Sequence, residues 1–573
     1  MRKRVLLSGI LLAAVVASGV LWLAGRPEQA QSAVSTRYAA ATASRYATQA
    51  ALELLRREGS AVDAAIAAQL VLTLVEPQSS GIGGGLFLLV ADAEGHMRVF
   101  DGRETAPAST YGKMYLQKNG QARTLEDIAT GGLSVGVPGA IAALDLAHRR
   151  YGKLPWRELF GPAIRLSENG FPVSHLLANA IAELKFDRLS REMRTVYFHK
   201  DGSPLRAGQL LRDLELAKTL RKIAEGGSSA FYEGEIAQAI VASVQKAPHN
   251  PGGMTLEDIR GYKARERSPI CLRFQAHNVC TTPAPSGGPS LLQILGILRD
   301  QSTASLKLGT LSQIHLVSQA ERLAYADRAK WLADPAYVAV PTEGLLDSGY
   351  LRSRAALINA SSDMGQVAAG TPPQREAKAT DYAPHRTNTL HGTSHVAIVD
   401  GSGQVVSMTS SIQAAFGAQI RAAGFVLNNE LTDFSREPSV AGKPVANAPA
   451  AGKRPLSAMS PTIVFDPQGK FFAAVGSPGG PEIITYNAQA LINIIAGKQS
   501  LQTAMSAPHF ANLNGPTILE KSTRIVAMAP ALFLKGHSVR LRELPSGLNG
   551  VRKALRGYEV ATDVRGEGLA AGD

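Results

Sequence analysis

A threonine that directly follows a glycine is the residue of this sequence best suited to nucleophilic chemistry. Gly392 and Thr393 stand at the head of the apolar segment 394–400. A threonine hydroxyl is a weak nucleophile unless a base lies beside it, and a free α-amine on the same residue can be that base. The pKa of such an amine, about 7.7 to 8.0, lies near working pH. We therefore predict that the chain cuts itself between Gly392 and Thr393.

A second glycine pair supports this hypothesis, which would be weak alone because a glycine and a threonine at a strand start are usually structural. Gly479 and Gly480 follow Ser477 and Pro478 after an expected strand. Two residues without side chains let backbone N–H groups approach a reacting carbonyl closely, as an oxyanion hole requires. The alternative for this pair is an ordinary turn.

Three charged side chains suit recognition of an amino-acid head group. Glu430 and Asp433 could bind a cationic amine, the alternative being solvated loop charges or a helix cap. Arg103 follows an expected strand, and a guanidinium can hold a carboxylate through two parallel hydrogen bonds. The alternative for Arg103 is a surface ion pair with Glu104 or Asp101.

Strands near both ends of the sequence are expected to position these residues. Hydrophobic periodicity predicts strands at 86–91, 97–101, 394–400, 405–410, 462–465 and 472–475. It predicts helices at 39–57, from 61, and at 140–151, 156–169, 214–224, 311–333, 487–496 and 501–506. The polar segment 375–390 is expected to be an exposed loop, which suits a cleavage junction. Sheet from both parts with helices outside predicts a mixed α/β sandwich.

Cys271 and Cys280 are the only cysteines, in a stretch that alternates like a hairpin with a turn near 276–278. The thiols could face each other and form a disulfide, which we favour, or remain two buried thiols. Their spacing is not typical of a metal site. The sequence predicts no metal and no organic cofactor.

The N-terminus is typical of an exported protein. Arg2, Lys3 and Arg4 precede an uncharged apolar run over residues 5–25. Residues 1–33 are therefore expected to be an export signal or a membrane anchor. The remainder is expected to be periplasmic or extracellular, either free or held at the inner membrane. The net charge is +13, but the sequence has no cluster of basic residues interleaved with aromatic ones. This favours a diffusely basic surface over a nucleic-acid-binding one.

Together the motifs resemble the gamma-glutamyltransferase (glutathione hydrolase) family of N-terminal-nucleophile hydrolases. The matching segments occur in the family's order at 61–65, 83–85, 103–107, 324–328, 393–395, 427–429, 433–435, 454–457 and 476–480. The resemblance implies a four-layer αββα fold (α/β, or α+β) assembled from two pieces of one precursor. These would be a large subunit of residues 34–392 and a small subunit of residues 393–573.

The resemblance also implies a role for each matching site residue. Thr393 would be the nucleophile for both cleavage and turnover, forming a γ-glutamyl ester from glutathione or a related donor that water or an acceptor amine resolves. Gly479 and Gly480 would form the oxyanion hole, and Ser411 would support the nucleophile. Arg103 and Ser457 would contact the α-carboxylate. Gln413, Glu430 and Asp433 would contact the α-amine.

Several positions depart from the family's pattern. Ala458 stands where a second serine is common, which removes a carboxylate hydrogen bond worth about 1.5–3 kcal/mol at most. Gln413 replaces a usual asparagine, and Ser394 a frequent threonine. Pro481 and Glu482 stand where small polar and basic residues are common. The segment 436–452 is short and lacks a lid tyrosine, which predicts a more open pocket.

Two other functions remain open from the sequence. Ala458 and Gln413 would also suit an acylase of the same fold that acts on a glutaryl or other side-chain amide, as cephalosporin acylases do. The other alternative is an unprocessed, membrane-anchored binding protein, for which the chain would stay in one piece.

Overall fold

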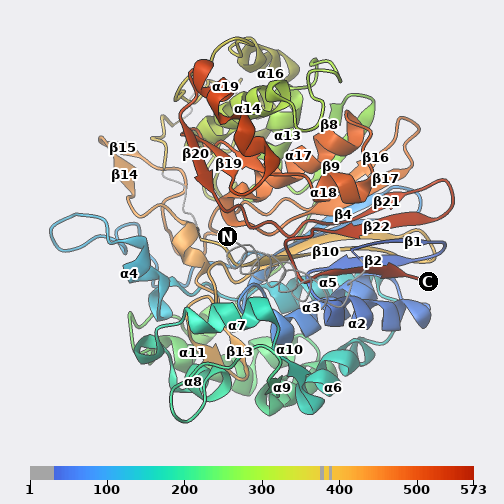
Figure 1. Cartoon of the computed structure of the whole chain (residues 1–573). Helices are drawn as coiled ribbons and strands as arrows, with labels where there is room; N and C mark the ends of the chain where they lie inside the picture. The colour runs from blue at the N-terminus through green and yellow to red at the C-terminus, as the bar shows by residue number, and fades with distance from the viewer. Residues whose placement is uncertain (1–30, 374–379, 386–389) are drawn as a thin grey trace, which may run out of the picture.

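Two antiparallel sheets of seven strands each form the centre of the protein (Figure 1). The computed structural model describes residues 31–373, 380–385 and 390–573. One sheet contains, in spatial order, β23 (Leu569–Gly572), β2 (Ala39–Thr42), β10 (Thr393–Val399), β11 (Val405–Ser411), β3 (Gly85–Ala91), β4 (Met97–Asp101) and β7 (Arg265–Arg267). The other contains β1 (Ser32–Ser35), β22 (Tyr558–Thr562), β21 (Asn549–Lys553), β17 (Phe471–Gly476), β16 (Thr462–Phe465), β9 (His277–Thr281) and β8 (Ile270–Phe274).

The two sheets pack face to face through small and branched side chains. Alanines are prominent in this inner layer, together with larger residues such as Leu89, Val399 and Ile463. Strands β3, β10 and β11 are buried at all seven of their positions, because the sheet is covered on both faces. Strand β3 accordingly reads as a nearly continuous apolar run, whereas β11 also buries hydroxyl residues such as Ser407 and Thr409.

Helices cover the two outer faces. Below the β10 sheet in Figure 1 lie α2 (Arg45–Arg56), α3 (Ala61–Val75), α5 (Ala140–Tyr151), α6 (Gly161–Asn169), α7 (His175–Ala182), α8 (Arg191–Tyr197), α9 (Leu214–Gly226), α10 (Ser229–Tyr232) and α11 (Gly234–Gln245). Above the β17 sheet lie α13 (Gly288–Ile297), α14 (Leu311–Trp331), α16 (Ser348–Ala355), α17 (Ile483–Ile495), α18 (Leu501–Met505) and α19 (Ala529–Leu534). The four-layer αββα architecture is therefore confirmed.

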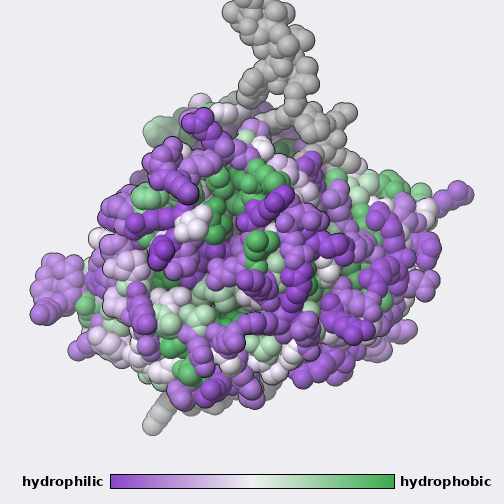
Figure 2. Space-filling view, turned by 90° about the horizontal axis from the view of Figure 1, so that it is seen from below, coloured by the Kyte–Doolittle hydropathy of each residue, from purple (hydrophilic) through white to green (hydrophobic). Residues whose placement is uncertain are grey.

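Helices at the lower surface are amphipathic, whereas α3 is buried along its whole length. Helix α9, for example, buries Leu216, Leu220 and Ile223 and exposes Arg221 and Lys222. Seen from below, the surface is accordingly mostly hydrophilic, with apolar patches between the charged side chains (Figure 2). Helices of this kind obtain their stability from the apolar face that packs on the sheet.

Most predicted elements are confirmed, with β16 and α5 at the predicted bounds, but the helix predicted at 39–57 is partly wrong. Residues Ala39–Thr42 form strand β2, and the helix begins only at Arg45. Alanine favours a helix, yet this short run is fully buried and pairs with β10 and β23. Small side chains fit between the two sheets, so tertiary pairing overrides the local propensity. The helix predicted at 156–169 is likewise a 3-10 turn, Trp156–Phe160, followed by α6.

The cysteine hairpin is present, and its register places Cys271 opposite Cys280. A disulfide joins the two residues. The turn lies at Gln275 and Ala276, one residue earlier than predicted, and Gln275 takes a positive φ of 51°.

Two expectations fall largely outside the described residues. Of the predicted exposed loop 375–390, residues 380–385 and Leu390 are described, and the prediction is wrong for Ala383 and His385, which are buried. The expected export segment, residues 1–33, is undescribed except for its last residues, of which Ser32 and Ala33 belong to β1. None of the helices within the described ranges has the length and apolar character needed to cross a bilayer.

The disulfide is expected to stabilise the fold. Because it closes a short loop, with the cysteines nine positions apart, replacing both with serine should lower the free energy of unfolding by about 2–3 kcal/mol. Urea unfolding of the double variant and the parent measures this difference. A reductant should lower the parent's midpoint, since Cys271 is exposed, and should not affect the variant. Equal midpoints for parent and variant would contradict the prediction.

Candidate active site

Thr393 is the first residue of β10, and the sheet register sets its surroundings. The antiparallel pairing of β10 with β11 places Thr393 directly opposite Ser411. The Thr393 hydroxyl donates to the Ser411 hydroxyl, with 3.3 Å between the oxygens. Thr393 is buried at 8% exposure, so its hydroxyl is shielded from bulk water.

The Ser411 hydroxyl also reaches the peptide bond that precedes Thr393. It donates to the Gly392 carbonyl oxygen at 2.8 Å and accepts from the backbone N–H of Gln413 at 2.8 Å. A Cβ on Gly392 would lie 2.8 Å from the carbonyl oxygens of Gln413 and Ala414, which explains the glycine. One hydroxyl therefore links the predicted nucleophile to the carbonyl of the predicted cleavage bond.

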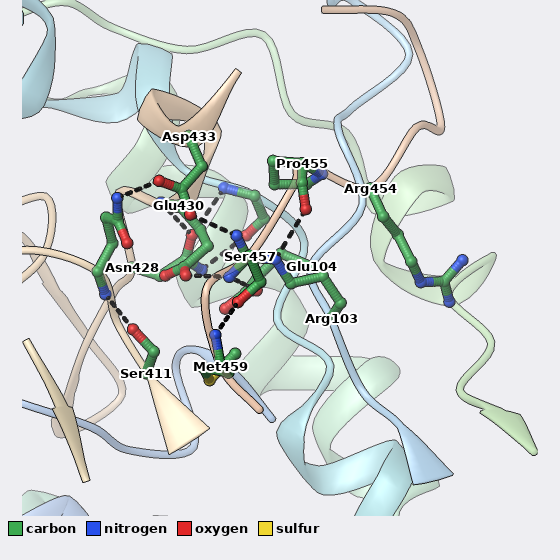
Figure 3. A network of polar contacts seen from close by, with 12 residues as sticks. Arg103, Glu104, Ser411, Asn428, Glu430, Asp433, Arg454, Pro455, Ser457 and Met459 are labelled. Atoms are coloured by element: carbon green, nitrogen blue, oxygen red, sulfur yellow. Dashed lines mark hydrogen bonds and ion pairs between the residues drawn. The ribbon is translucent and has the colours of Figure 1, made fainter. Parts of the chain in front are cut away.

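A buried charge cluster centred on Arg103 forms the opposite wall (Figure 3). The Arg103 guanidinium is fully buried and pairs with Glu430 and with Asp433, the latter at 2.5 Å. Its Nε donates to the Pro455 carbonyl at 3.0 Å, and its Nη2 donates to the Leu456 carbonyl at 3.1 Å. Arg103 therefore pairs with Glu430 and Asp433, and not with Asp101, although Glu104 also lies 3.6 Å from its Nη1.

Burial dominates the electrostatics of this cluster. It raises the pKa of Glu430 to about 7, with Arg103 opposing and Asp433 reinforcing the shift. It also raises the pKa of Asp433, again against the effect of Arg103, and holds the pKa of Glu104 well above its usual value. Burial alone would lower the pKa of Arg103, but the neighbouring carboxylates outweigh it and raise that pKa. The cluster thus gains negative charge as the pH rises through neutrality.

Gln413 and Ser457 lie on either side of the cluster. Gln413 adopts a positive φ of 79°, unusual for a residue with a side chain, and its Nε2 donates to Asp433 at 2.5 Å. The Ser457 hydroxyl accepts from the Met459 N–H at 3.1 Å. The Ser457 carbonyl accepts from Arg328 at 2.8 Å.

The matching segment 427–429 contains Asn428 and Asn429, but the sequence did not reveal their structural role. The Asn428 side chain donates to the carbonyls of Gly83 and Gly136 and accepts from the backbone N–H of Glu430. It thereby fixes the start of the 3-10 turn Glu430–Asp433 that carries both acidic residues. Two adjacent asparagines before two acids in a loop are a signal for such side-chain-to-backbone bonding.

The glycine pair lies where β17 leads into α17. Gly479 and Gly480 have φ values of 133° and 58°, which favour glycine. A Cβ on Gly479 would lie 2.5 Å from the Tyr486 ring, and one on Gly480 would lie 2.2 Å from the Leu390 carbonyl oxygen. The Tyr325 hydroxyl donates to the Pro481 carbonyl and so ties the pair to α14.

These elements line a cavity of about 40 Å³ that is partly open to solvent and has room for about three water molecules. Seven of the predicted site residues line it, together with Leu390 of the segment before Thr393. The seven are Thr393, Ser411, Gln413, Glu430, Asp433, Ser457 and Gly480. Arg103 and Gly479 are not among the residues that line it.

A grouping of possible cation ligands lies elsewhere. Asp92, Glu94 and His96 come within 4.8 Å of one another in the turn between β3 and β4, where Glu94 and His96 are exposed. Exposed groups of this kind are common without an ion.

The chemistry available at the Thr393 cavity is that of hydroxyls, backbone N–H groups and buried charges.

Comparisons with known proteins show which proteins this chain is similar to. The sequence model described as Gamma-glutamyltranspeptidase matches residues 47–573. The chain is 36% identical over 473 residues to the glutathione hydrolase proenzyme of Escherichia coli, covering 81% of this chain and 79% of that protein. It is 32% identical over 515 residues to an acylase proenzyme (ACY 1) of a Pseudomonas species, covering 88% of each.

A solved structure shares the fold over almost the whole chain. The cephalosporin acylase from Bacillus halodurans superposes with a TM-score of 0.82 at 26% identity, covering 96% of this chain and 98% of that one.

Proposed function

This chain belongs to the gamma-glutamyltranspeptidase family, and on that premise we propose that it is a self-processing γ-glutamyl hydrolase and transferase whose nucleophile is Thr393. The observation that carries the proposal is the Ser411 hydroxyl, bonded on one side to the Thr393 hydroxyl and on the other to the Gly392 carbonyl. A nucleophile, its supporting group and the bond to be cut are thereby assembled in the uncut chain.

The first reaction is scission of the chain. The Thr393 oxygen adds to the Gly392 carbonyl carbon, and the Ser411 hydroxyl donates to the oxygen on which charge develops. The C–N bond then breaks, the hydroxyl proton passes to the departing amine, and an ester joins Gly392 to the Thr393 oxygen. Water hydrolyses this ester, which leaves a Gly392 carboxylate and a free Thr393 with both its hydroxyl and its amine.

Turnover uses the same hydroxyl with the new amine as its base. The amine accepts the hydroxyl proton while the oxygen attacks the γ-carbonyl of the donor. Backbone N–H groups at Gly479 and Gly480 are proposed to hold the oxyanion. The leaving amine takes the proton, and water or an acceptor amine then releases the γ-glutamyl group from its ester with Thr393.

Relatives named glutathione hydrolase proenzymes support glutathione as a donor. The Thr393 cavity carries Glu430 and Asp433, which suit the α-amine of a γ-glutamyl group. The two subunits, residues 34–392 and 393–573, would remain associated, since β10 and β11 of the small subunit lie between β2 and β3 of the large one. We further propose that the protein acts outside the cytoplasm, on the strength of its apolar, basic-flanked N-terminus.

Thr393→Ala is expected to abolish both reactions. The purified parent should give two pieces, the smaller beginning at Thr393, whereas the variant should remain one full-length chain and should not turn over γ-glutamyl-p-nitroanilide. Gel electrophoresis with N-terminal sequencing and a chromogenic assay measure the two effects. Ser394→Ala is the matched control, because the neighbouring Ser394 hydroxyl pairs with Ser80 and not with Ser411. Cutting or turnover in Thr393→Ala equal to the parent's would defeat the proposal.

The pH dependence of kcat/KM should reveal the ionisation of the Glu430 carboxyl. Below its pKa of about 7 the carboxyl is protonated and neutral, and above it the carboxylate can bind the donor's ammonium group. For a γ-glutamyl donor, kcat/KM of the parent should therefore rise as the pH increases through 7, mainly through KM, and again near about 8 as the Thr393 amine loses its proton.

Glu430→Gln should remove the first of these two rises and keep the second. Steady-state kinetics between pH 5 and 9 on the processed enzyme measures this change. A glutaryl donor, which lacks the amine, serves as the control and should show only the second rise with the parent. An unchanged pH profile in Glu430→Gln would rule out this role for the carboxylate.

The acylase alternative is favoured by Ala458 and by the likeness to the acylase relatives. The two functions differ in what Asp433 does, because a glutaryl group has no α-amine. Asp433→Asn should lower kcat/KM for γ-glutamyl-p-nitroanilide by about 10- to 100-fold, the effect of one hydrogen bond to a charged group, and leave glutaryl-p-nitroanilide unaffected. If the parent prefers the glutaryl donor and Asp433→Asn changes kcat/KM for neither donor, the acylase function is favoured.

A further inference from the structure

A buried histidine from the segment before the predicted cleavage bond lines the Thr393 cavity. His385 is 9% exposed and lies among the cavity-lining residues, as do Thr393 and Leu390. The sequence predicted an exposed loop at this position, and the proposed reactions do not use the residue. An imidazole at the wall of a reactive cavity can accept or donate a proton, so its hydrogen bonds decide which of the two it does.

Backbone hydrogen bonds hold His385 at this wall. Its N–H donates to the carbonyl of Ala329, in the last turn of α14, at 2.9 Å. Two residues earlier, the Ala383 N–H donates to the Pro444 carbonyl at 2.9 Å. Ala329 belongs to the predicted large subunit and Pro444 to the predicted small one. The segment that carries the imidazole is therefore attached to both.

The side-chain bond to the same carbonyl fixes the tautomer of the imidazole. Nδ1 of His385 lies 2.9 Å from the Ala329 oxygen, and a carbonyl can only accept, so Nδ1 carries the proton. In a neutral imidazole Nε2 is then unprotonated and carries a lone pair. None of the residues that the structure describes donates to this Nε2. The ring thus offers a hydrogen-bond acceptor at the cavity wall.

The surroundings keep this imidazole neutral. Burial lowers the pKa of His385 to about 4, and the positive charge of Arg328 adds to the shift. The Ala329 carbonyl opposes it, and Lys453 reinforces it. At neutral pH, Nε2 is therefore free to accept a proton. The same low pKa makes it a weak base, comparable in strength with a carboxylate.

The other proton acceptors of the cavity are less suitable in the uncut chain. The Asp433 carboxylate pairs with Arg103 at 2.5 Å. The Glu430 carboxylate also pairs with Arg103, and burial raises its pKa to about 7, so it is partly protonated at neutral pH. The nitrogen of Thr393 still belongs to a peptide bond. His385 is thus the lining group best suited to accept a proton during scission.

We propose that His385 is the base that activates water to hydrolyse the ester between Gly392 and the Thr393 oxygen, which is the second half of scission. The inference rests on the proposed function. Nε2 accepts a proton from a water molecule in the cavity, and the water oxygen bonds to the Gly392 carbonyl carbon. The bond from that carbon to the Thr393 oxygen then breaks, and the proton passes from Nε2 to the departing oxygen. The Gly392 carboxyl group ionises, and the imidazole is left unchanged.

Two substitutions of His385 remove the base, and each keeps a different contact. His385→Asn keeps an N–H that can donate to the Ala329 carbonyl, and His385→Gln keeps a polar atom near the position of Nε2. Both should slow cutting about 100-fold, the lower end of the range for a general base, because His385 is a weak one. Pulse-labelled full-length chains, followed on a gel during a chase, give the rate of cutting.

Hydroxylamine distinguishes a lost base from a disturbed structure. It is a strong nucleophile that cleaves esters without the help of a base. Added to either His385 variant, it should restore cutting and leave a hydroxamate on Gly392, which mass spectrometry of the larger piece detects. It should not restore cutting to Thr393→Ala, because that variant forms no ester.

His391→Gln is the matched control. His391 lies two residues before Thr393, yet it is not among the residues that line the cavity. Its variant should therefore be cut at the parent's rate. Glu430→Gln tests the competing carboxylate and should be cut faster than either His385 variant.

The outcomes separate the inference from the function on which it rests. A parent that stays in one piece would overturn the proposed function. A parent that is cut, with both His385 variants cut equally fast, would overturn the role of His385 alone. Slow cutting that hydroxylamine does not restore would overturn it too, because the block would then precede the ester. Loss of the folded state in both variants, seen by circular dichroism, would assign His385 to the fold and overturn its role as a base.

Discussion

The candidate active site depends first on the register between β10 and β11. Seven consecutive pairs fix it, from Thr393 opposite Ser411 to Val399 opposite Val405. Both strands are buried on both faces, so a slip by one residue would exchange every side chain between two differently packed layers. The hydroxyl pair at the head of the strands is therefore held by the packing of the whole sandwich, and residues far from the cavity determine its geometry.

The second constraint is electrostatic. Five charged side chains lie in or behind the cavity wall: Arg103, Glu104, Arg328, Glu430 and Asp433. Arg103 is neutralised within the protein and holds the two acids in place, which makes it a positioning residue in the uncut chain. Burial raises the pKa values of the three acids, and Arg103 opposes that shift at each of them. A zwitterionic head group would bring one group of each sign to a site that already holds both.

The sequence predicted the layered fold and most of its elements because apolar strand segments and amphipathic helices leave recognisable patterns. It failed at Ala39–Thr42, where local propensity and sheet pairing disagree. Most of the candidate site residues that it named line one cavity, yet it could not show that Arg103 pairs with Glu430 and Asp433. Pairings between residues more than 300 positions apart leave no local signal.

The uncut chain also explains why a glycine is needed at position 480 in two states. The Leu390 carbonyl lies so close to Gly480 that a Cβ there would overlap it. In the proposed turnover, the same glycine approaches the donor's oxyanion. The segment before Thr393 therefore occupies, with its own carbonyl, space next to the group that would stabilise the substrate. The proposed scission would create the catalytic amine and would also cut the chain two residues after Leu390, so a base for turnover and freedom for the segment beside Gly480 would arise from one broken bond.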